Sequence, residues 1–214
     1  MNDEQNYKPV LNVYTKSDDL EDNRSAAYNA SWQPMRGGGT NFKTRKLVKK
    51  DSNRIEFKKT LFLNVVPFLS IIPFFVWVFV FFPSGELVIQ ILSLLPPLAF
   101  MIFGAFVYVK TNKSIVFDKT HGYYWKRKGE PNFNSMDDKG LVKLSEIVSL
   151  QIIQELVSGS KKSYMSYEIN LILKDNSRLN VIDHGDKDSI IQDAQQLADF
   201  LEKPLWKKQL RQHF

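Results

Sequence analysis

The residues that come closest to a catalytic or metal-binding group are Asp183-His184-Gly185-Asp186, where an imidazole lies between carboxylates at a predicted strand-to-helix junction. A metal ion would need further ligands, and the chain has only two other histidines. General acid–base catalysis is a second use of such a histidine. A structural arrangement is the simpler interpretation of these residues. In it, Asp183 or Asp186 caps the next helix, Gly185 makes a tight turn and His184 is structural.

The rest of the chain offers no catalytic motif. Ser158-Gly159-Ser160 resembles neither a nucleophile elbow nor a phosphate loop, because no Gly-Lys-Ser/Thr and no helix start follows it. The chain contains no cysteine, which excludes disulfides, thiolate metal sites and cysteine nucleophiles. We therefore expect no catalytic residue, no cofactor and no metal site, and a protein that is not an enzyme.

Aromatic and basic side chains are mixed at 123–128, which makes this segment a candidate contact surface. Near a bilayer it could touch lipid headgroups or a phosphorylated ligand, although core packing on one side and solvation on the other is the simpler interpretation. Trp32 lies in a polar segment. Three roles are open for it: docking on the chain's own domain, binding a partner, or lying at a lipid interface. The possible partner or lipid contacts are Trp32, Arg36, Tyr124, Trp125, Lys126, Arg127 and Lys128.

A long apolar block precedes most of these residues. Between Lys59 and Lys110 the only charged residue is Glu86, which divides the block into 60–82 and 87–109, each of 23 residues. At 1.5 Å per helical residue, each half reaches ~34 Å and can cross ~30 Å of hydrocarbon. The sequence therefore predicts a transmembrane helical hairpin over 60–109. With no other charge at membrane depth, a transporter or channel acting alone is disfavoured.

The distribution of basic residues predicts how the hairpin is oriented. Residues 40–59 contain eight Lys or Arg against two acidic residues, and 110–128 contain six more, whereas the turn between the spans has none. Positive charge beside a span stays in the cytoplasm. We therefore expect a multi-pass protein with cytoplasmic N- and C-termini. No recognition helix or aromatic platform accompanies the basic residues, so we expect no nucleic-acid partner.

The chain outside the hairpin divides into three parts. Residues 1–39 are polar and include three consecutive glycines, which predicts a mostly disordered N-terminal tail. Residues 40–59 form the basic juxtamembrane part, with two predicted β-segments at 41–50 and 54–59. Residues 110–214 are predicted to form a cytoplasmic β-domain with a C-terminal helix.

Short apolar runs of period two, bounded by turn residues, predict the strands of this domain. They lie at 114–118, 123–128, 146–157, 167–173 and 178–183. The last three should form an antiparallel meander, with Val148, Leu150, Ile152 and Leu156 on one face. Apolar residues at helical spacing predict a final helix from about 188 to 203, ended by Pro204. The fold class is thus an α+β membrane protein with a two-helix hairpin and an antiparallel β-sheet capped by a C-terminal helix.

Two resemblances extend this prediction. With the segments at 41–50 and 54–59, the order of seven strands and a helix resembles a pleckstrin-homology-like (PH-like) barrel with the hairpin inserted between its second and third strands. Several runs are also similar to those of uncharacterised bacterial two-span inner-membrane proteins. These runs are 34–39, 148–151, 167–171, 180–185, 197–201 and 204–206. The resemblance implies a bacterial inner (plasma) membrane and brings no functional residues with it.

An anchor without catalytic residues favours a role in binding. We expect a non-enzymatic membrane-anchored protein-interaction module, acting as a subunit or accessory factor, including an immunity-type factor, of a bacterial inner-membrane complex. Its partners would be the lipid bilayer and a membrane protein. The alternative is a PH-like membrane sensor that binds lipid headgroups.

Overall fold

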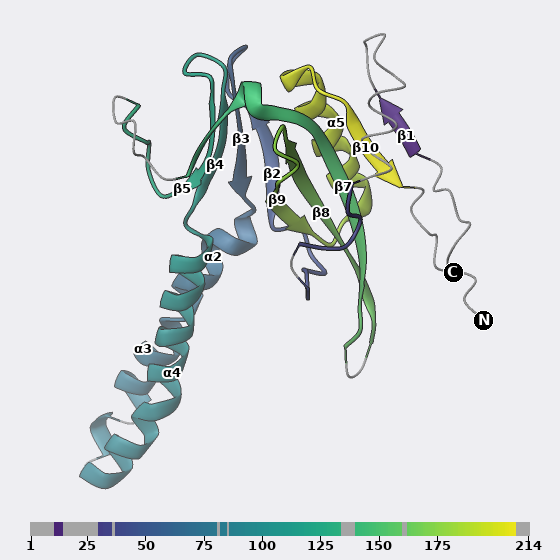
Figure 1. Cartoon of the computed structure of the whole chain (residues 1–214). Coiled ribbons are helices and arrows are strands. Elements are labelled where there is room, and N and C mark those ends of the chain that lie inside the picture. The colour runs from purple at the N-terminus through teal and green to yellow at the C-terminus, as the bar shows by residue number, and fades with distance from the viewer. Residues whose placement is uncertain are drawn as a thin grey trace, which may run out of the picture. The chain divides into compact units, whose positions relative to one another are not determined.

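A computed structural model describes residues 11–14, 30–35, 37–80, 82–84, 86–133, 140–159 and 162–208. They form two compact units, each with its own internal packing (Figure 1). The helical hairpin comprises 59–114 together with 127–130. The β-domain comprises the described residues up to 58, residues 115–126 and the described residues from 131 onward.

The first arm of the hairpin is broken into two helices. The hairpin elements are α2 (Leu61–Leu69), α3 (Ile72–Val80), the 3-10 turn η1 (Phe82–Ser84) and α4 (Leu87–Thr111). Pro73 lies in the first turn of α3, has no N–H, and in a continuous helix would clash with the carbonyl of Leu69. This clash accounts for the break between α2 and α3. The second arm continues as one helix through two prolines.

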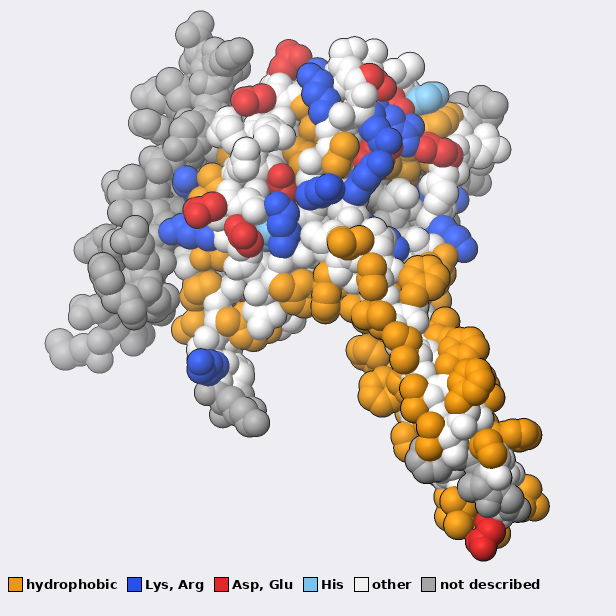
Figure 2. All heavy atoms as spheres, turned by 180° about the vertical axis from the view of Figure 1, so that it is seen from behind, with side chains coloured by type: hydrophobic (Ala, Val, Ile, Leu, Met, Phe, Trp, Pro, Cys, Tyr) orange, Lys and Arg blue, Asp and Glu red, His pale blue; other side chains and the backbone are white. Residues whose placement is uncertain are grey.

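Both arms, 61–80 and 87–111, are long and apolar enough to cross a membrane, by length and composition. Their side chains are mostly exposed, since only 6% and 11% of their most apolar stretches are buried. Leu61 is 77% exposed and Phe79 is 78% exposed. Figure 2 shows hydrophobic side chains covering the surface of the hairpin. The helices are therefore not the buried core helices of a soluble domain.

Small and polar residues join the two arms. A methyl group at Gly104 of α4 would clash with the Ser70 hydroxyl, so the arms approach closely there. Ser70 donates its hydroxyl to the Pro67 carbonyl at 2.6 Å. Further along, the Trp77 indole Nε1 donates to Ser93 Oγ at 2.9 Å. Close backbone approach and interhelical hydrogen bonds are typical of helix pairs in lipid.

The first sheet of the β-domain joins the segments on both sides of the hairpin in sequence. Its strand order is β2 (Arg45–Lys49), β3 (Arg54–Lys59), β4 (Ser114–Asp118), β5 (Tyr123–Arg127) and β6 (Leu141–Lys143). Antiparallel β3 and β4 place Ile55 opposite Phe117 and Phe57 opposite Ile115, and all four side chains are buried. The two β-segments before the hairpin thus belong to the sheet.

The second sheet contains the predicted meander and two further strands. Its order is β1 (Leu11–Tyr14), β10 (Leu205–Lys208), β7 (Ile147–Val157), β8 (Tyr164–Leu173) and β9 (Arg178–His184). Strands β7, β8 and β9 are antiparallel to one another, which confirms the meander. Strand β10 pairs in parallel with β7, so the sheet is mixed.

Helix α5 (Lys187–Leu201) closes one side of the second sheet. Its N-cap is Asp186, whose carboxylate accepts a hydrogen bond from the Ser189 amide at 2.8 Å. The helix ends at Glu202, which adopts a left-handed conformation with φ of 56°. Its buried apolar side chains pack into one core with residues of both sheets; they are Ile190, Ala194, Leu197, Ala198, Phe200 and Leu201.

The structure departs from the sequence prediction in two ways. In the described residues the two sheets do not close into a barrel, and β1, β6 and β10 add strands that were not predicted. These strands have only three or four residues, too few for a period-two pattern to stand out. The expected inner face of β7 is also wrong in part. Leu156 is 52% exposed, and a register shift between Ile147 and Ser149 puts Ile147 in the core instead of Val148.

Candidate interaction surface

The aromatic residues at 123–128 lie mainly in the interior. Tyr124 and Trp125 are 3% and 0% exposed, so they present almost no surface to a partner or a lipid. The Tyr124 ring packs against Phe117 with centroids 4.7 Å apart, and Arg54 lies over the Trp125 ring at 5.4 Å. Burial raises the pKa of Tyr124, and the nearby Arg45 charge opposes that shift.

The basic residues of the same segment differ from one another. The Lys126 ammonium donates to the carbonyls of Asn180 and Val181 at 3.0 and 2.8 Å, and to the Asn180 side-chain oxygen at 3.2 Å. It therefore links β5 to β9 within the β-domain. Arg127 is half-buried and Lys128 is exposed. Only Lys128 is fully open to solvent among these six consecutive residues.

Trp32 docks on the domain of its own chain, one of the three outcomes expected for it. Its half-buried side chain packs against Ile172 of β8 and Trp206 of β10. Arg36, the other site residue expected in the tail, lies outside the described residues. Residues 30–35 and 37–44 form a segment that we call the strap. The prediction of a tail over 1–39 therefore covers residues that pack on the β-domain.

The strap crosses one face of the second sheet, which we call the outer face. Alternation along the strands places Ser149, Gln151, Ile153, Glu155, Ser166, Glu168, Asn170, Ile172 and Arg178 on this face. The register confirms the grouping, because Gln151 lies opposite Asn170 and Glu155 lies opposite Ser166. The opposite, inner face carries the apolar side chains that pack on α5; they include Leu150, Ile152, Ile169, Leu171 and Val181.

The first half of the strap is held through its main chain. Arg178 Nη1 donates to the carbonyls of Ser31 and Gln33 at 2.9 and 3.0 Å. Gln151 Nε2 also donates to the Ser31 carbonyl, at 3.1 Å. The Met35 amide donates to Glu168 Oε2 at 3.2 Å. Side chains of the sheet thus hydrogen-bond strap atoms that every residue type possesses.

The glycine run continues the same pattern. The amides of Gly38 and Gly39 donate to the two oxygens of the Glu155 carboxylate at 3.1 and 3.4 Å. The Tyr164 hydroxyl donates to the Gly39 carbonyl at 2.7 Å. Gly38 has φ of +79°, a conformation that favours glycine. A methyl group at Gly39 would clash with the Ser166 hydroxyl, so the backbone lies directly on the sheet there.

The outer face is unusually polar for a buried surface. Ser149, Gln151 and Asn170 are each 0% exposed, and Ser166 and Glu168 are each 1% exposed. Asn170 Nδ2 donates to Glu168 Oε2 at 2.9 Å. Among the described residues, Ser149 Oγ, Ser166 Oγ and Asn170 Oδ1 lack a hydrogen-bond partner, as does the indole Nε1 of Trp206. Buried polar atoms without a partner are rare in folded proteins and call for an explanation.

The far end of the strap is fastened near the helix start. The Thr44 hydroxyl donates to the Asp183 carbonyl at 2.7 Å, and the Gly185 amide donates to the Phe42 carbonyl at 3.1 Å. A methyl group at Gly185 would clash with the backbone of Asn41. Gly185 is therefore needed for close approach between the strap and the turn before α5.

The Asp183–Asp186 segment forms a buried turn. His184 is 0% exposed, and its Nδ1 accepts a hydrogen bond from the Asp186 amide at 3.1 Å. Desolvation and the nearby Lys43 charge lower the pKa of His184, which favours the neutral ring. Lys43 Nζ donates to Ser189 Oγ at 2.9 Å. The arrangement fixes the start of α5, with Asp186 as the N-cap.

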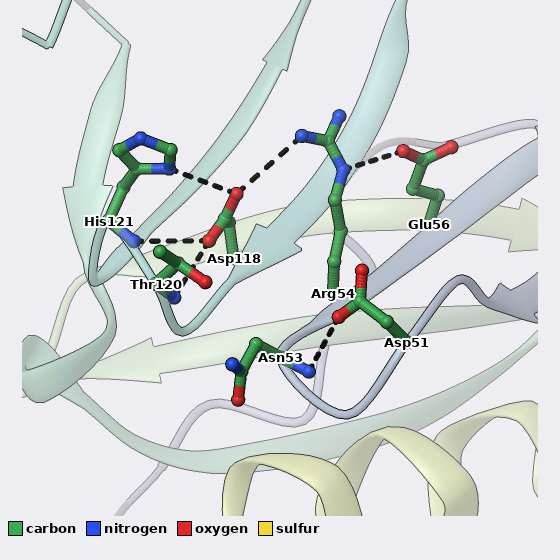
Figure 3. A network of polar contacts seen from close by, with 7 residues as sticks. All are labelled: Asp51, Asn53, Arg54, Glu56, Asp118, Thr120 and His121. Carbon is green, nitrogen blue, oxygen red and sulfur yellow. Dashed lines mark hydrogen bonds and ion pairs between the residues drawn. The ribbon is translucent and has the colours of Figure 1, made fainter.

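A second polar network lies at the β4–β5 turn (Figure 3). Asp118 accepts hydrogen bonds from the amides of Thr120 and His121 at 2.8 and 3.1 Å, and its other oxygen lies 3.1 Å from His121 Nδ1. Arg54 lies 3.5 Å from the same carboxylate and 2.7 Å from Glu56. Desolvation alone would raise the pKa of Asp118, but the hydrogen bonds from His121 and Thr120 lower it overall.

A pocket of 490 Å³ lies beside this turn. Its lining residues are Lys119, His121, Gly122, Tyr123, Lys143, Leu144, Ser145 and Leu201. Lys119 Nζ is 3.0 Å from a carboxylate oxygen of the exposed Glu202. Lys119 and Lys143 make the lining basic, and because Glu202 already lies beside Lys119, Lys143 is the lysine of the lining that we expect to receive a small anion.

No cluster of three or more metal-ligating side chains occurs in the described part of the chain. A search of known protein families finds no model that matches the chain, and a search of curated proteins finds no match.

The strap and the outer face were missed at the level of sequence. A signal was present, because Ser149 and Gln151 alternate with apolar residues on β7 as Glu168 and Asn170 do on β8. Such alternation is also what a solvent-facing sheet surface shows. Nothing in the pattern indicates that a segment more than a hundred residues away covers these side chains.

Proposed function

We propose that this chain is a membrane-anchored protein-interaction module without catalytic activity, a subunit or accessory factor of a bacterial inner-membrane complex. An immunity-type factor falls within this class. The observation that carries the anchoring is the exposed apolar surface of the hairpin, on which Leu61 and Phe79 are more than three-quarters exposed. Contiguous apolar surface of this extent marks a membrane or protein contact.

The proposed orientation places both termini in the cytoplasm. It is supported by the basic residues of 40–59 and 110–128 and by the absence of Lys and Arg from the turn between the spans. Reporter fusions after residue 40 and after residue 214 test it. Cytoplasmic signals from both are expected, and a periplasmic signal from either would contradict the topology.

The β-domain supplies the proposed binding function. Its outer face already holds an irregular segment through seven hydrogen bonds to main-chain atoms. Recognition of extended peptides by main-chain hydrogen bonds, with pockets for particular side chains, is a common mode of protein binding. The order of β2 to β5, β7 to β9 and α5 also supports a PH-like relationship for this domain.

Affinity purification of the full chain from native membranes in mild detergent tests this function. The matched control is a tagged hairpin alone, residues 59–114, which keeps the apolar surface and lacks the β-domain. A protein that co-purifies with the full chain and not with the hairpin supports the proposal. Recovery of the same proteins with both would contradict a binding role for the β-domain.

The basic pocket favours a second candidate function, the binding of lipid headgroups. Lys119 and Lys143 lie in its lining, and charge-assisted contacts to phosphate suit such a site. Calorimetry with a soluble inositol phosphate and the full chain in nanodiscs tests it. Binding that Lys143→Ala weakens, and that the exposed control Lys162→Ala leaves unchanged, would favour the sensor over the protein-binding module.

A further inference from the structure

We propose that the outer face of the second sheet binds a peptide segment of a partner protein, and that the strap is its exchangeable occupant in cis; we call this binding surface the groove. The inference rests on the proposed protein-binding function and specifies the surface and the partner chemistry. Seven hydrogen bonds from the sheet reach main-chain atoms between Ser31 and Gly39. Because any peptide without proline at the donor positions has these atoms, the main-chain bonds by themselves do not require the sequence of the strap.

Two positions set the side-chain requirements. At one end, Trp32 packs against Ile172 and Trp206, one aliphatic and one aromatic side chain, which form an apolar site. Seven residues later, Gly39 lies so close to Ser166 that a larger side chain would clash. The groove therefore fits a segment with an aromatic residue at one end and glycine near the other.

The strap leaves several buried polar atoms of the outer face without a hydrogen-bond partner in the described part of the chain. Ser149 Oγ, Ser166 Oγ and Asn170 Oδ1 lack hydrogen-bond partners among the described residues, as does Trp206 Nε1. The strap contributes Gly39 next to Ser166, and this glycine has no side chain to bond the Ser166 hydroxyl. A partner segment with Ser, Thr or Asn side chains between its aromatic residue and its glycine would hydrogen-bond these atoms as well.

Exchange has to overcome the tether. A segment joined covalently to its own site competes at an effective concentration of about millimolar. A free peptide that binds like the strap therefore competes poorly with it in the native chain. Weakening the strap should expose the groove without changing the groove itself.

The test uses the full chain in detergent and a fluorescent synthetic peptide with the sequence of residues 30–42. Trp32→Ala removes the aromatic anchor of the strap and leaves Ile172 and Trp206 in place. We expect this variant to bind the peptide at least ~10-fold more tightly than the native chain does, as removal of a tethered competitor requires. Gly39→Val, which should lift the strap off Ser166, is a second route to the same result.

A reversible disulfide between the strap and the sheet provides the control. The chain has no cysteine of its own, so two introduced cysteines can pair only with each other. A Cβ atom added to Gly39 would lie 2.7 Å from Ser166 Cβ. This distance is about an ångström shorter than the usual Cβ–Cβ distance in a disulfide. The double variant Gly39→Cys and Ser166→Cys should therefore form a disulfide after a small adjustment. Oxidised, it should bind neither the peptide nor any partner that co-purifies with the native chain, and reduction should restore both.

Three results would overturn the proposal. One is that Trp32→Ala and Gly39→Val both melt cooperatively and bind no more peptide than the native chain. Another is peptide binding by the oxidised double variant. The third is a partner that the oxidised variant retains, which would place the protein-binding site elsewhere while leaving the proposed function intact.

Discussion

The two faces of the β7–β8–β9 sheet are covered in opposite ways. The inner face is closed by apolar packing against α5, and Leu150, Ile169 and Leu197 are each 0% exposed there. The outer face is closed by a strap that hydrogen-bonds polar side chains such as Glu155 and Glu168. Side chains packed in the apolar core lose their contacts only when the whole core unfolds. A hydrogen-bonded segment on the surface can detach by local unfolding, while the rest of the domain stays folded. The comparison teaches that one sheet can be covered by an apolar core on one face and by a hydrogen-bonded segment on the other.

The largest effect is expected from removing the strands that precede the hairpin. A fragment of residues 111–214 should be far less stable than one in which residues 40–59 are joined to it by a short linker. Ile55 and Phe57 are both 2% exposed, and each contributes roughly 1.5 to 3 kcal/mol by burial. Urea denaturation of the two fragments measures the difference. Equal midpoints would show that β2 and β3 do not contribute to the inner core.

Truncation inside the inner face should come next. Leu197→Ala removes a fully buried side chain and should lower the free energy of unfolding by ~2 to 5 kcal/mol. The neighbouring Gln196→Ala is the matched control, since Gln196 is exposed on the same helix. A thermal melt of each variant measures the effect. A small loss for Leu197→Ala would mean that α5 does not close this face.

Truncation on the outer face should behave differently. Trp32→Ala should cost about 1 to 2 kcal/mol, an ordinary value for a partly buried side chain, and the loss should fall mainly on the strap. Limited proteolysis should cut the variant within 30–44 sooner than the native chain, while the melting temperature changes little. If the whole domain melts earlier to the same extent as Leu197→Ala, the two faces are not independent.

The smallest effect concerns pH and the turn where the strap meets α5. The pKa of His184 in the folded state is lowered from its ordinary value of about 6.5. The contribution of the neutral His184 ring to the free energy of unfolding is therefore present above pH 6.5, and it is lost as the pH falls through the folded-state pKa. His184→Asn keeps an acceptor for the Asp186 amide and should flatten this acid loss. Melts between pH 7 and 5 measure it, and an unchanged slope would exclude His184 as its source.

Asp193 is a second buried titratable group of this region, and its contribution has the opposite sign. Desolvation raises its pKa, so its contribution is present below the ordinary value near 3.8 and is lost as the pH rises through the folded value. Asp193→Asn should therefore make the acid loss steeper rather than flatter. The pair of variants separates the two titrations.

The sequence predicted the inner face better than the outer one for a physical reason. Apolar spacing along β8 and α5 reports burial directly, and residues such as Ile169 and Leu197 were assigned correctly. The polar residues of the outer face gave the pattern of a solvated surface, because alternation cannot show what lies on top of it. The residues at 123–128 also show that a sequence pattern does not reveal what covers a side chain. The side chains of Tyr124 and Trp125 are buried, and Lys126 of β5 hydrogen-bonds a carbonyl of β9.

Amide hydrogen exchange in the full chain tests the difference between the two faces most directly. The amides of Gly38 and Gly39 are held by the Glu155 carboxylate, whereas those of β8 are held by the sheet itself. We predict that the strap amides exchange through a local opening, with a free energy well below that of the β8 amides, which should require global unfolding. If the strap amides and the β8 amides exchange with the same free energy and the same dependence on denaturant, the strap opens only when the domain unfolds. That result would contradict a strap that detaches independently of the β-domain.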